Sequence, residues 1–150
     1  MRGGSGNDAL QGGAGDDRIT GNAGDDLIRG GAGTDILLGG GGADIVEYRT
    51  GAVGGDGSDT IRGFSAGDGD RIAIRDLAGE PLDLLRALDS NRDGSLTARD
   101  RWVSTARVTL EGETAVSLVI DIGGAAPGVP SGLDRLILFD LRGVPATVLD

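Results

Sequence analysis

Aspartate recurs at every ninth residue through the first third of the chain. Five nine-residue units run from residue 3 to residue 47, and the sixth residue of each unit is Asp8, Asp17, Asp26, Asp35 and Asp44. Each unit opens with a glycine-rich stretch, which can adopt the positive-φ conformations that a tight turn requires. A tight turn directs carbonyl oxygens inward, and the aspartate adds a carboxylate. Calcium prefers such oxygen ligands, so this spacing predicts a series of calcium sites.

A second set of oxygen-bearing side chains lies in residues 89–100. Its spacing matches the ligand positions of the EF-hand calcium loop, which are occupied here by Asp89, Asn91, Asp93, Ser95, Thr97 and Asp100. Aspartate stands at the twelfth position, where glutamate is usual, and its shorter side chain predicts weaker calcium binding or more tolerance of magnesium. The alternative is a loop rich in Asx turns that binds no metal.

The residues that flank this loop predict a short helix–loop–helix. Pro81 can begin the entering helix, and the leucines of residues 82–88 give it an apolar face. Thr97 and Asp100 have the spacing of a capping box, which predicts an exiting helix that runs toward Trp102.

The elements that must position the repeated aspartates are short strands. The eighth residue of each unit is a bulky aliphatic: Leu10, Ile19, Ile28, Leu37 and Val46. We expect the three residues after each turn to form a strand whose middle side chain points inward. One inward aliphatic side chain per nine residues makes a thin core, so bound metal must supply much of the stability. A flexible Gly/Asp-rich linker is the alternative, but it does not explain the fixed offsets.

This pattern resembles the nonapeptide repeat of the RTX calcium-binding proteins. The resemblance implies a mainly β fold, a right-handed parallel β-roll in which two units make one turn. It places Asp8, Asp26 and Asp44 in one column and Asp17 and Asp35 in the opposite column. Several Ca²⁺ ions would lie between successive loops of a column, held by carbonyl oxygens and by the aspartates.

The period breaks after residue 47 and returns once in residues 54–62, where Asp59 holds the sixth position. The following stretch resembles the segment that closes the roll in serralysin-type proteases and alginate-epimerase R-modules. That resemblance implies that Phe64 and Ile72 plug the end of the roll and that Asp68 and Asp70 are candidate ligands of a last calcium ion. For these two acids a polar hairpin turn is the alternative interpretation.

Three regions are predicted: an RTX calcium-binding β-roll in residues 1–75, an EF-hand-like helix–loop–helix in residues 76–105 and a C-terminal β region in residues 106–150. Alternating apolar residues predict antiparallel strands in the last region, which would cap the open end of the roll. RTX proteins carry a C-terminal signal for type I secretion, and residues 146–150 are compatible with one. Entry into the first unit two residues after Met1 suggests a piece of a longer protein.

Composition excludes several classes of function. The net charge is −10, with 20 aspartates, 4 glutamates, 14 arginines and no lysine, which disfavours nucleic-acid binding. Cysteine and histidine are both absent, so disulfides, thiol nucleophiles and Cys/His zinc sites are excluded. No apolar run approaches the roughly 20 residues that a membrane-spanning helix needs.

These observations predict a secreted, extracellular bacterial module that is not an enzyme and whose folding is controlled by Ca²⁺. Its partners would be calcium ions and the type I secretion machinery. Any catalytic domain would lie outside this chain. The alternative function is a calcium-dependent polysaccharide-binding, surface-binding or adhesion module, in which calcium bridges the acidic chain to an anionic polysaccharide.

Overall fold

The structure is a computed structural model that describes residues 1–49, 57–75, 95–99, 101–121, 135–141 and 143–145. These residues form strands and turns, and none of them is helical. The strands are β1 (Arg2–Ser5), β2 (Ala9–Ala14), β3 (Arg18–Ala23), β4 (Leu27–Ala32), β5 (Ile36–Gly41), β6 (Ile45–Arg49), β7 (Ser58–Arg62), β8 (Arg71–Arg75), β9 (Ser95–Thr97), β10 (Val103–Leu110), β11 (Glu113–Asp121), β12 (Arg135–Leu138) and β13 (Gly143–Pro145).

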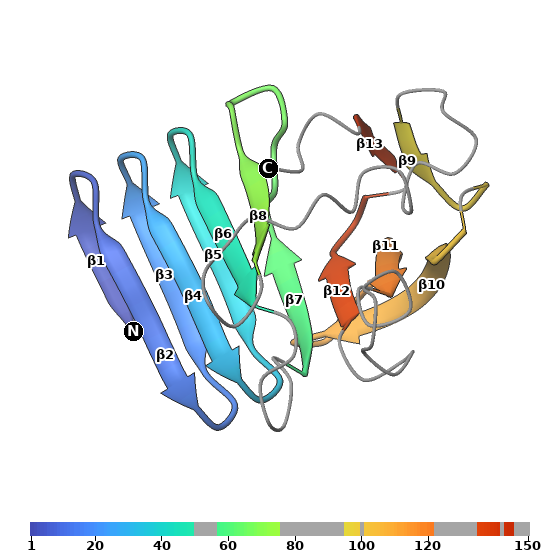
Figure 1. Ribbon diagram of the computed structural model, residues 1–150, viewed down its shortest axis with the longest axis horizontal. Coiled ribbons are helices and arrows are strands. Elements are labelled where there is room, and N and C mark those ends of the chain that lie inside the picture. Colours follow the sequence, from blue (N-terminus) through green and yellow to red (C-terminus); the bar gives the residue numbers. More distant parts are fainter. Residues whose placement is uncertain (50–56, 76–94, 100, 122–134, 142, 146–150) are drawn as a thin grey trace.

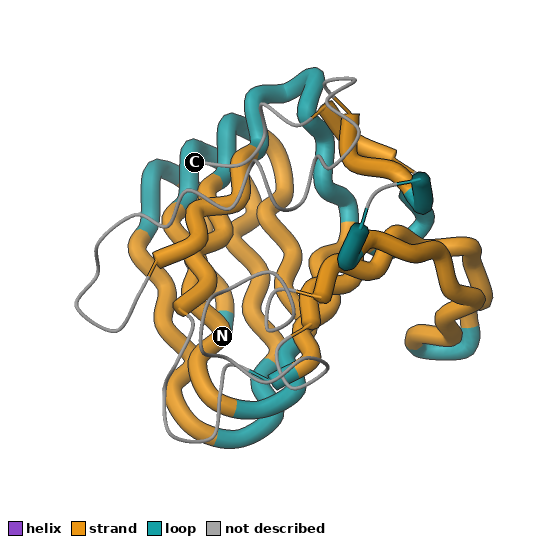
Figure 2. The backbone as a smooth tube through the Cα atoms, turned by 45° about the vertical axis from the view of Figure 1, so that its right-hand side comes forward, coloured by secondary structure: helices purple, strands orange, loops and turns teal. Residues whose placement is uncertain are grey.

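The repeats wind into a β-roll with two parallel sheets. Strands β1, β3, β5 and β7 pair in that order in one sheet, and β2, β4, β6 and β8 pair in the other (Figure 1). Consecutive units therefore alternate between the sheets. The glycine-rich turns line up along the two edges of the roll, where Figure 2 shows them as rows of loops. This arrangement confirms the expected parallel β-roll with two units per turn.

The register of both sheets stacks equivalent residues of alternate units. Leu10 lies opposite Ile28, and Ile28 lies opposite Val46, so the partners are 18 residues apart. Ile19 and Leu37 pair in the same way in the other sheet. All five of these inward side chains are buried, as the period predicted. The insertion after β6 lengthens the next steps, so that Val46 pairs with Ile72 and Leu37 with Ile61.

The C-terminal strands extend one sheet of the roll. Strand β12 pairs with β7 in parallel, and β11 and β10 follow in antiparallel order. The inward row continues without interruption, because Ile61 lies opposite Leu138 and Leu138 lies opposite Leu118. Both leucines have no exposed surface. The described residues of the C-terminal region thus form β-strands as expected, and these strands lie beside the last rung of the roll (Figure 1).

The predicted exiting helix of the EF-hand-like segment is wrong. Ser95–Thr97 is strand β9, which pairs with β13 in antiparallel fashion, and a turn leads on to β10. Trp102 has a φ of 66°, which a right-handed helix does not allow. The β-branched and alternating residues of β10 favour a strand, and pairing with β11 outweighs the local capping signal. The entering helix lies outside the described residues.

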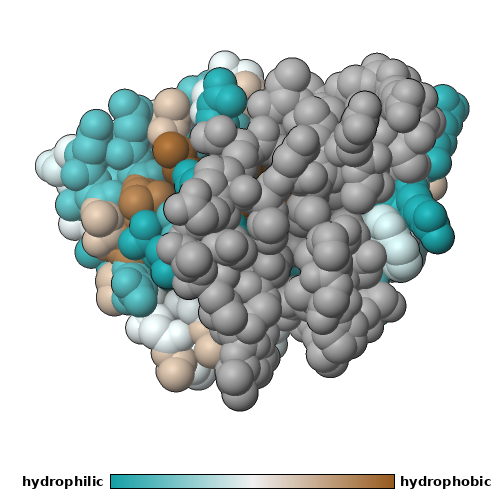
Figure 3. All heavy atoms as spheres, viewed as in Figure 1, coloured by the Kyte–Doolittle hydropathy of each residue, from teal (hydrophilic) through white to brown (hydrophobic). Residues whose placement is uncertain are grey.

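The surface of the roll is mostly hydrophilic where Figure 3 shows its described atoms. Among the described residues, Met1 is the one large hydrophobic residue that is exposed. The described part of the chain includes no apolar helix of the length that a membrane crossing requires.

Candidate metal centre

The repeated aspartates form two ladders along the edges of the roll. In each ladder the backbone N–H of one aspartate donates to Oδ1 of the aspartate two units later. The donor–acceptor distances are 2.8 Å for Asp8 to Asp26, 2.9 Å for Asp26 to Asp44 and 2.8 Å for Asp17 to Asp35. Stacking therefore brings the carboxylates together in the two columns that the RTX resemblance implied.

Two later acids extend these ladders beyond the perfect repeats. The N–H of Asp35 donates to Oδ1 of Asp59 at 2.9 Å, and the N–H of Asp44 donates to Oδ1 of Asp70 at 3.0 Å. The other oxygen of Asp70 accepts the N–H of Ser65 at 2.8 Å. Asp68 is exposed on the neighbouring turn and its backbone bonds to Ser65. Of the two predicted roll-closing acids, the structure places Asp70 in a ladder and Asp68 outside it.

The second carboxylate oxygen of the ladder aspartates is buried without a partner. Oδ2 accepts no hydrogen bond in four of them: Asp8, Asp26, Asp35 and Asp44. The last three residues are at most 2% exposed. A buried carboxylate oxygen loses its hydration and is costly unless a cation or a donor compensates it. These atoms have the chemistry of calcium ligands, so the ladder fits the ion that its spacing predicted.

The first glycine of each unit leaves space for oxygen atoms to converge. A Cβ on Gly12 would lie 2.6 Å from Oδ2 of Asp17 and 2.5 Å from the carbonyl oxygen of Gly30. Gly21 is placed in the same way against Asp26 and against the carbonyl oxygen of Gly39. A side chain at this position would therefore displace either the carboxylate or a carbonyl oxygen of the next loop in the column.

The other turn glycines allow the loops to stack closely. Gly24 has a φ of 125°, and a Cβ there would collide with the backbone of Gly6 in the loop 18 residues earlier. Asn22 takes the place of glycine in the third unit at a φ of 88°, which asparagine tolerates better than most residues. The glycines are thus required both by the turn and by the approach of one loop to the next.

Burial and neighbouring charge change the electrostatics of the ladders. Burial raises the pKa of Asp35 above its ordinary value of 3.8, and the charges of Asp17 and Asp16 add to the rise, whereas the backbone N–H of Asp17 opposes it. Burial likewise raises the pKa of Asp44, against the hydrogen bond from the backbone of Asp26. A cation bound in the ladders would favour the ionised form that the apoprotein disfavours.

No three acidic side chains of the described residues converge on one point. An ion in the ladder would consequently take one or two carboxylate oxygens and complete its coordination with backbone carbonyl oxygens. Calcium accepts six to eight oxygen ligands of mixed type, which suits a site built from glycine-rich turns.

The EF-hand-like ligands are not brought to the ladders. Ser95 and Thr97 lie on β9, and Thr97 Oγ1 accepts the backbone N–H of Arg99 at 3.3 Å. The remaining predicted ligands of this loop lie outside the described residues: Asp89, Asn91, Asp93 and Asp100.

Two features of the roll were not predicted. The fifth residue of the first units forms a second, exposed ladder, in which the N–H of Ala43 donates to Oδ1 of Asp25 at 2.8 Å and that of Asp25 to Oδ1 of Asn7 at 2.9 Å. The sequence carried a signal for it, because Asn7, Asp16 and Asp25 all occupy that position.

The second feature is a buried glutamate surrounded by arginines. The Nε and Nη2 atoms of Arg29 donate to the two carboxylate oxygens of Glu47 at 2.9 Å each, and the Nε of Arg49 donates to the same group at 2.9 Å. Arg75 lies 3.5 Å away. The Arg29 hydrogen bond is the main cause that lowers the pKa of Glu47. This cluster depends on pairing between β4, β6 and β8, and no local spacing indicates it.

Comparison with known proteins agrees with the repeat. The family model of the RTX calcium-binding nonapeptide repeat (4 copies) matches residues 2–37 and 11–46. No curated protein matches the chain. One similar solved structure is the solution structure of the AlgE6R3 subunit from the Azotobacter vinelandii mannuronan C5-epimerase, with 22% identity, a TM-score of 0.47 and coverage of 97% of this chain and 78% of that one. Residues 2–46 therefore match the model of the RTX calcium-binding nonapeptide repeat.

Proposed function

We propose that this chain is a secreted, non-catalytic module that folds when its aspartate ladders bind calcium. The ions would lie between successive loops of each column, where they contact the ladder carboxylates. The candidate ligands in the roll are Asp8, Asp17, Asp26, Asp35, Asp44, Asp59 and Asp70. The chain has neither histidine nor cysteine, which supports a structural role for the metal.

The observation that carries this proposal is the set of buried, unpartnered Oδ2 atoms in Asp26, Asp35 and Asp44. Among the residues that the structure describes, no arginine forms an ion pair with them, although Glu47 in the same roll has three arginine partners. Burial raises the pKa of Asp44, and the neighbouring charges of Asp70 and Asp26 add to the rise. Such a stack opposes folding in the absence of a cation and favours it when a divalent ion is bound.

The expected free energy is large enough to control folding. An ion that binds with a Kd of about 10⁻⁴ M contributes roughly 1.4 kcal/mol at millimolar calcium. Three or four such ions would add about 4–6 kcal/mol, which is comparable with the whole stability of a small domain. At cytosolic calcium, far below this Kd, the contribution vanishes. The chain would then be unfolded inside the cell and would fold after type I export.

Circular dichroism in millimolar calcium and in excess EGTA tests this proposal. We expect a β spectrum in calcium and a largely unfolded spectrum in the chelator, with recovery when calcium is restored. Magnesium at the same concentration serves as the ionic-strength control. Identical spectra in calcium and in EGTA would show that the ladders fold without the ion.

A matched pair of variants assigns the effect to the ladder. Asp35→Asn removes the charge at a buried ladder position, whereas Asp25→Asn removes a charge at an exposed position and keeps the oxygen that accepts from Ala43. We expect Asp35→Asn to lose one ion in isothermal titration calorimetry and about 1.4 kcal/mol of calcium-dependent stability. Asp25→Asn should retain the wild-type stoichiometry. Equal losses in the two variants would contradict the assignment.

A further inference from the structure

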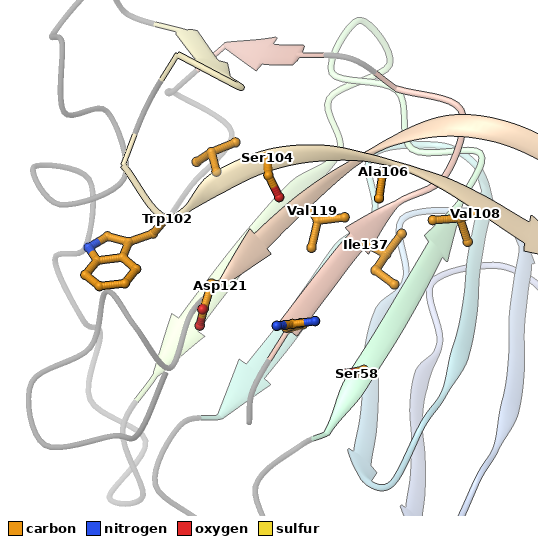
Figure 4. A pocket seen from close by; sticks show the side chains of 10 residues that line it. Ser58, Trp102, Ser104, Ala106, Val108, Val119, Asp121 and Ile137 are labelled. Carbon is orange, nitrogen blue, oxygen red and sulfur yellow. The ribbon is translucent and has the colours of Figure 1, made fainter. Parts of the chain in front are cut away.

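A cleft lies outside the roll, on the face of the extended sheet that is opposite its core. Its volume is about 440 Å³, within the range of small-molecule sites. Strand β10 curves across one side of the cleft, and β11, β12 and β7 form the floor (Figure 4). The polar and aromatic side chains that line it are Ser58, Trp102, Ser104, Asp121 and Arg135.

Four of these residues form one row, which runs from the turn before β10 across β11, β12 and β7. The backbone N–H of Asp121 donates to the carbonyl oxygen of Trp102 at 2.8 Å. Asp121 lies opposite Arg135 on β12, and Arg135 lies opposite Ser58 on β7. An indole, a carboxylate, a guanidinium and a hydroxyl are thus placed side by side in the cleft.

The neighbouring row gives the cleft an apolar strip. Ser104 lies opposite Val119, and Val119 lies opposite Ile137. Both apolar side chains line the cleft and are partly exposed. Figure 4 shows Val119 and Ile137, from the strands of the floor, below Ser104 and Ala106 of β10. A ligand in this cleft would consequently meet hydrogen-bonding groups along one side and apolar surface along the other.

Two residues of the row have unusual features: the backbone conformation of Trp102 and the charge of Arg135, which is unpaired among the described residues. Trp102 is in the left-handed region with a φ of 66°, which is a rare conformation for a bulky side chain and is often found at functional sites. The Arg101 guanidinium lies 5.1 Å from the centre of the Trp102 ring and covers it on one side. Arg135 is exposed, and within the described part of the chain its guanidinium forms no ion pair, although the protein carries a net charge of −10.

We propose that this cleft binds a saccharide. A sugar ring combines hydroxyl groups, which match the donors and acceptors of Asp121, Arg135 and Ser104, with an apolar C–H face that packs against an indole. One acid and one base in the row suit a ligand of low charge, and a sugar carboxylate could pair with Arg135 in bidentate fashion. The proposal rests on the calcium-dependent fold only because β7, a rung of the roll, forms part of the floor.

The tryptophan of the cleft is also the reporter for its test. Trp102 is the sole tryptophan of the chain, so indole fluorescence reports on this site alone. The calcium-loaded protein, shown to be folded by circular dichroism, is titrated with cellotetraose, maltotetraose and tetragalacturonate. We expect a saturable change in emission and protection from acrylamide quenching with at least one of the three. A response to tetragalacturonate alone would indicate that Arg135 binds the sugar carboxylate. A response to a neutral sugar would indicate that the sugar ring packs against Trp102.

Two arginine variants give the matched comparison. Arg135→Ala removes a guanidinium from the cleft, and Arg107→Ala removes one from an exposed position of β10 that does not line it. Arg135→Ala should weaken binding at least about tenfold, while Arg107→Ala should leave the affinity within about twofold of wild type.

The proposal is overturned if the folded protein shows no response to any of the three sugars, if the two arginine variants behave alike, or if only an acidic peptide such as tetraglutamate gives saturation. Failure of the calcium proposal would appear separately, as a circular dichroism spectrum that EGTA does not change. Sugar binding that persists in EGTA would leave the cleft assignment intact and remove its link to calcium.

Discussion

The roll and the strands that extend it are built from different kinds of interior. Between residues 8 and 46 each unit buries one aliphatic side chain, and the last three units also bury the ladder carboxylates of Asp26, Asp35 and Asp44. In β10–β12 the interior is formed by Leu118, Ile120, Leu136 and Leu138, none of which has exposed surface. Among the described residues every buried acid lies in the roll or its last rungs, from Asp26 to Asp70.

This contrast shows where the metal has to act. The apolar strands gain stability from burial, at roughly 25 cal/mol per Å² of apolar surface, in any solvent condition. The roll buries charge as well as aliphatic side chains, and burial of charge stabilises only when a counterion compensates it. The two regions nevertheless share one sheet, because β12 pairs with β7. Formation of the roll therefore supplies the edge on which the C-terminal strands assemble.

The largest expected loss of stability comes from a substitution in the apolar interior of the C-terminal strands. Leu118→Ala removes a fully buried side chain that pairs with Leu138, and it should cost about 2–5 kcal/mol of unfolding free energy. The number of calcium ions bound by the folded protein should not change. Urea unfolding in millimolar calcium measures the first quantity and calorimetry the second. A loss of ions in this variant would mean that the two interiors are not separate.

A smaller effect is expected from a substitution in the turns. Gly21→Ala places a Cβ against Oδ2 of Asp26 and 2.6 Å from the carbonyl oxygen of Gly39. We expect a loss of about 1–3 kcal/mol together with weaker calcium binding. Gly41→Ala is the matched control, because a Cβ there meets nothing within 4 Å. Urea unfolding and calcium titration of both variants should separate them. Equal behaviour would show that the first glycine of the unit is not reserved for oxygen ligands.

The period explains why so much of the roll could be predicted. The RTX resemblance implied two units per turn, and the resulting register of 18 residues places Leu10 against Ile28. Given that register, the columns and the core follow from the repeat. Counting failed where the repeat was interrupted. Asp70 joins a ladder 26 residues after Asp44, and the insertion between β6 and β7 hides that relation. The insertion also hides the pairing of Arg75 with Glu47. Arg29 lies one turn of the roll before Glu47, and its ion pair was missed although the 18-residue register holds there.

Local signals were least reliable outside the repeats. The spacing of Thr97 and Asp100 indicated a helix, yet the chain forms β9, a turn and β10. Pairing across eight registered residues of β10 and β11 outweighs a capping preference that involves a single turn. The cleft beside Trp102 could not be predicted either, because Asp121 and Arg135 become neighbours only through strand pairing.

The smallest expected effect is a reversal of the pH dependence by calcium. Folding raises the pKa of Asp35 and Asp44 above the ordinary value of 3.8, so without calcium the folded state binds more protons than the unfolded state. Stability in EGTA should then rise as the pH falls from 7 through the raised pKa values toward about 4. In calcium, stability should instead decrease as the pH falls, because protons compete with the ion for the same carboxylates.

Glu47 sets the lower limit of this window. Its arginine partners lower its pKa below the ordinary 4.5, so its contribution is present above that value and is lost as the pH falls through its lowered pKa. The folded fraction in EGTA, followed by circular dichroism, should therefore rise toward mildly acidic pH and then fall. In Glu47→Gln the fall should disappear while the rise remains. If stability in EGTA decreases steadily from pH 7 to pH 4, the buried ladder carboxylates are already compensated without a metal, and the distinction between the two interiors is lost.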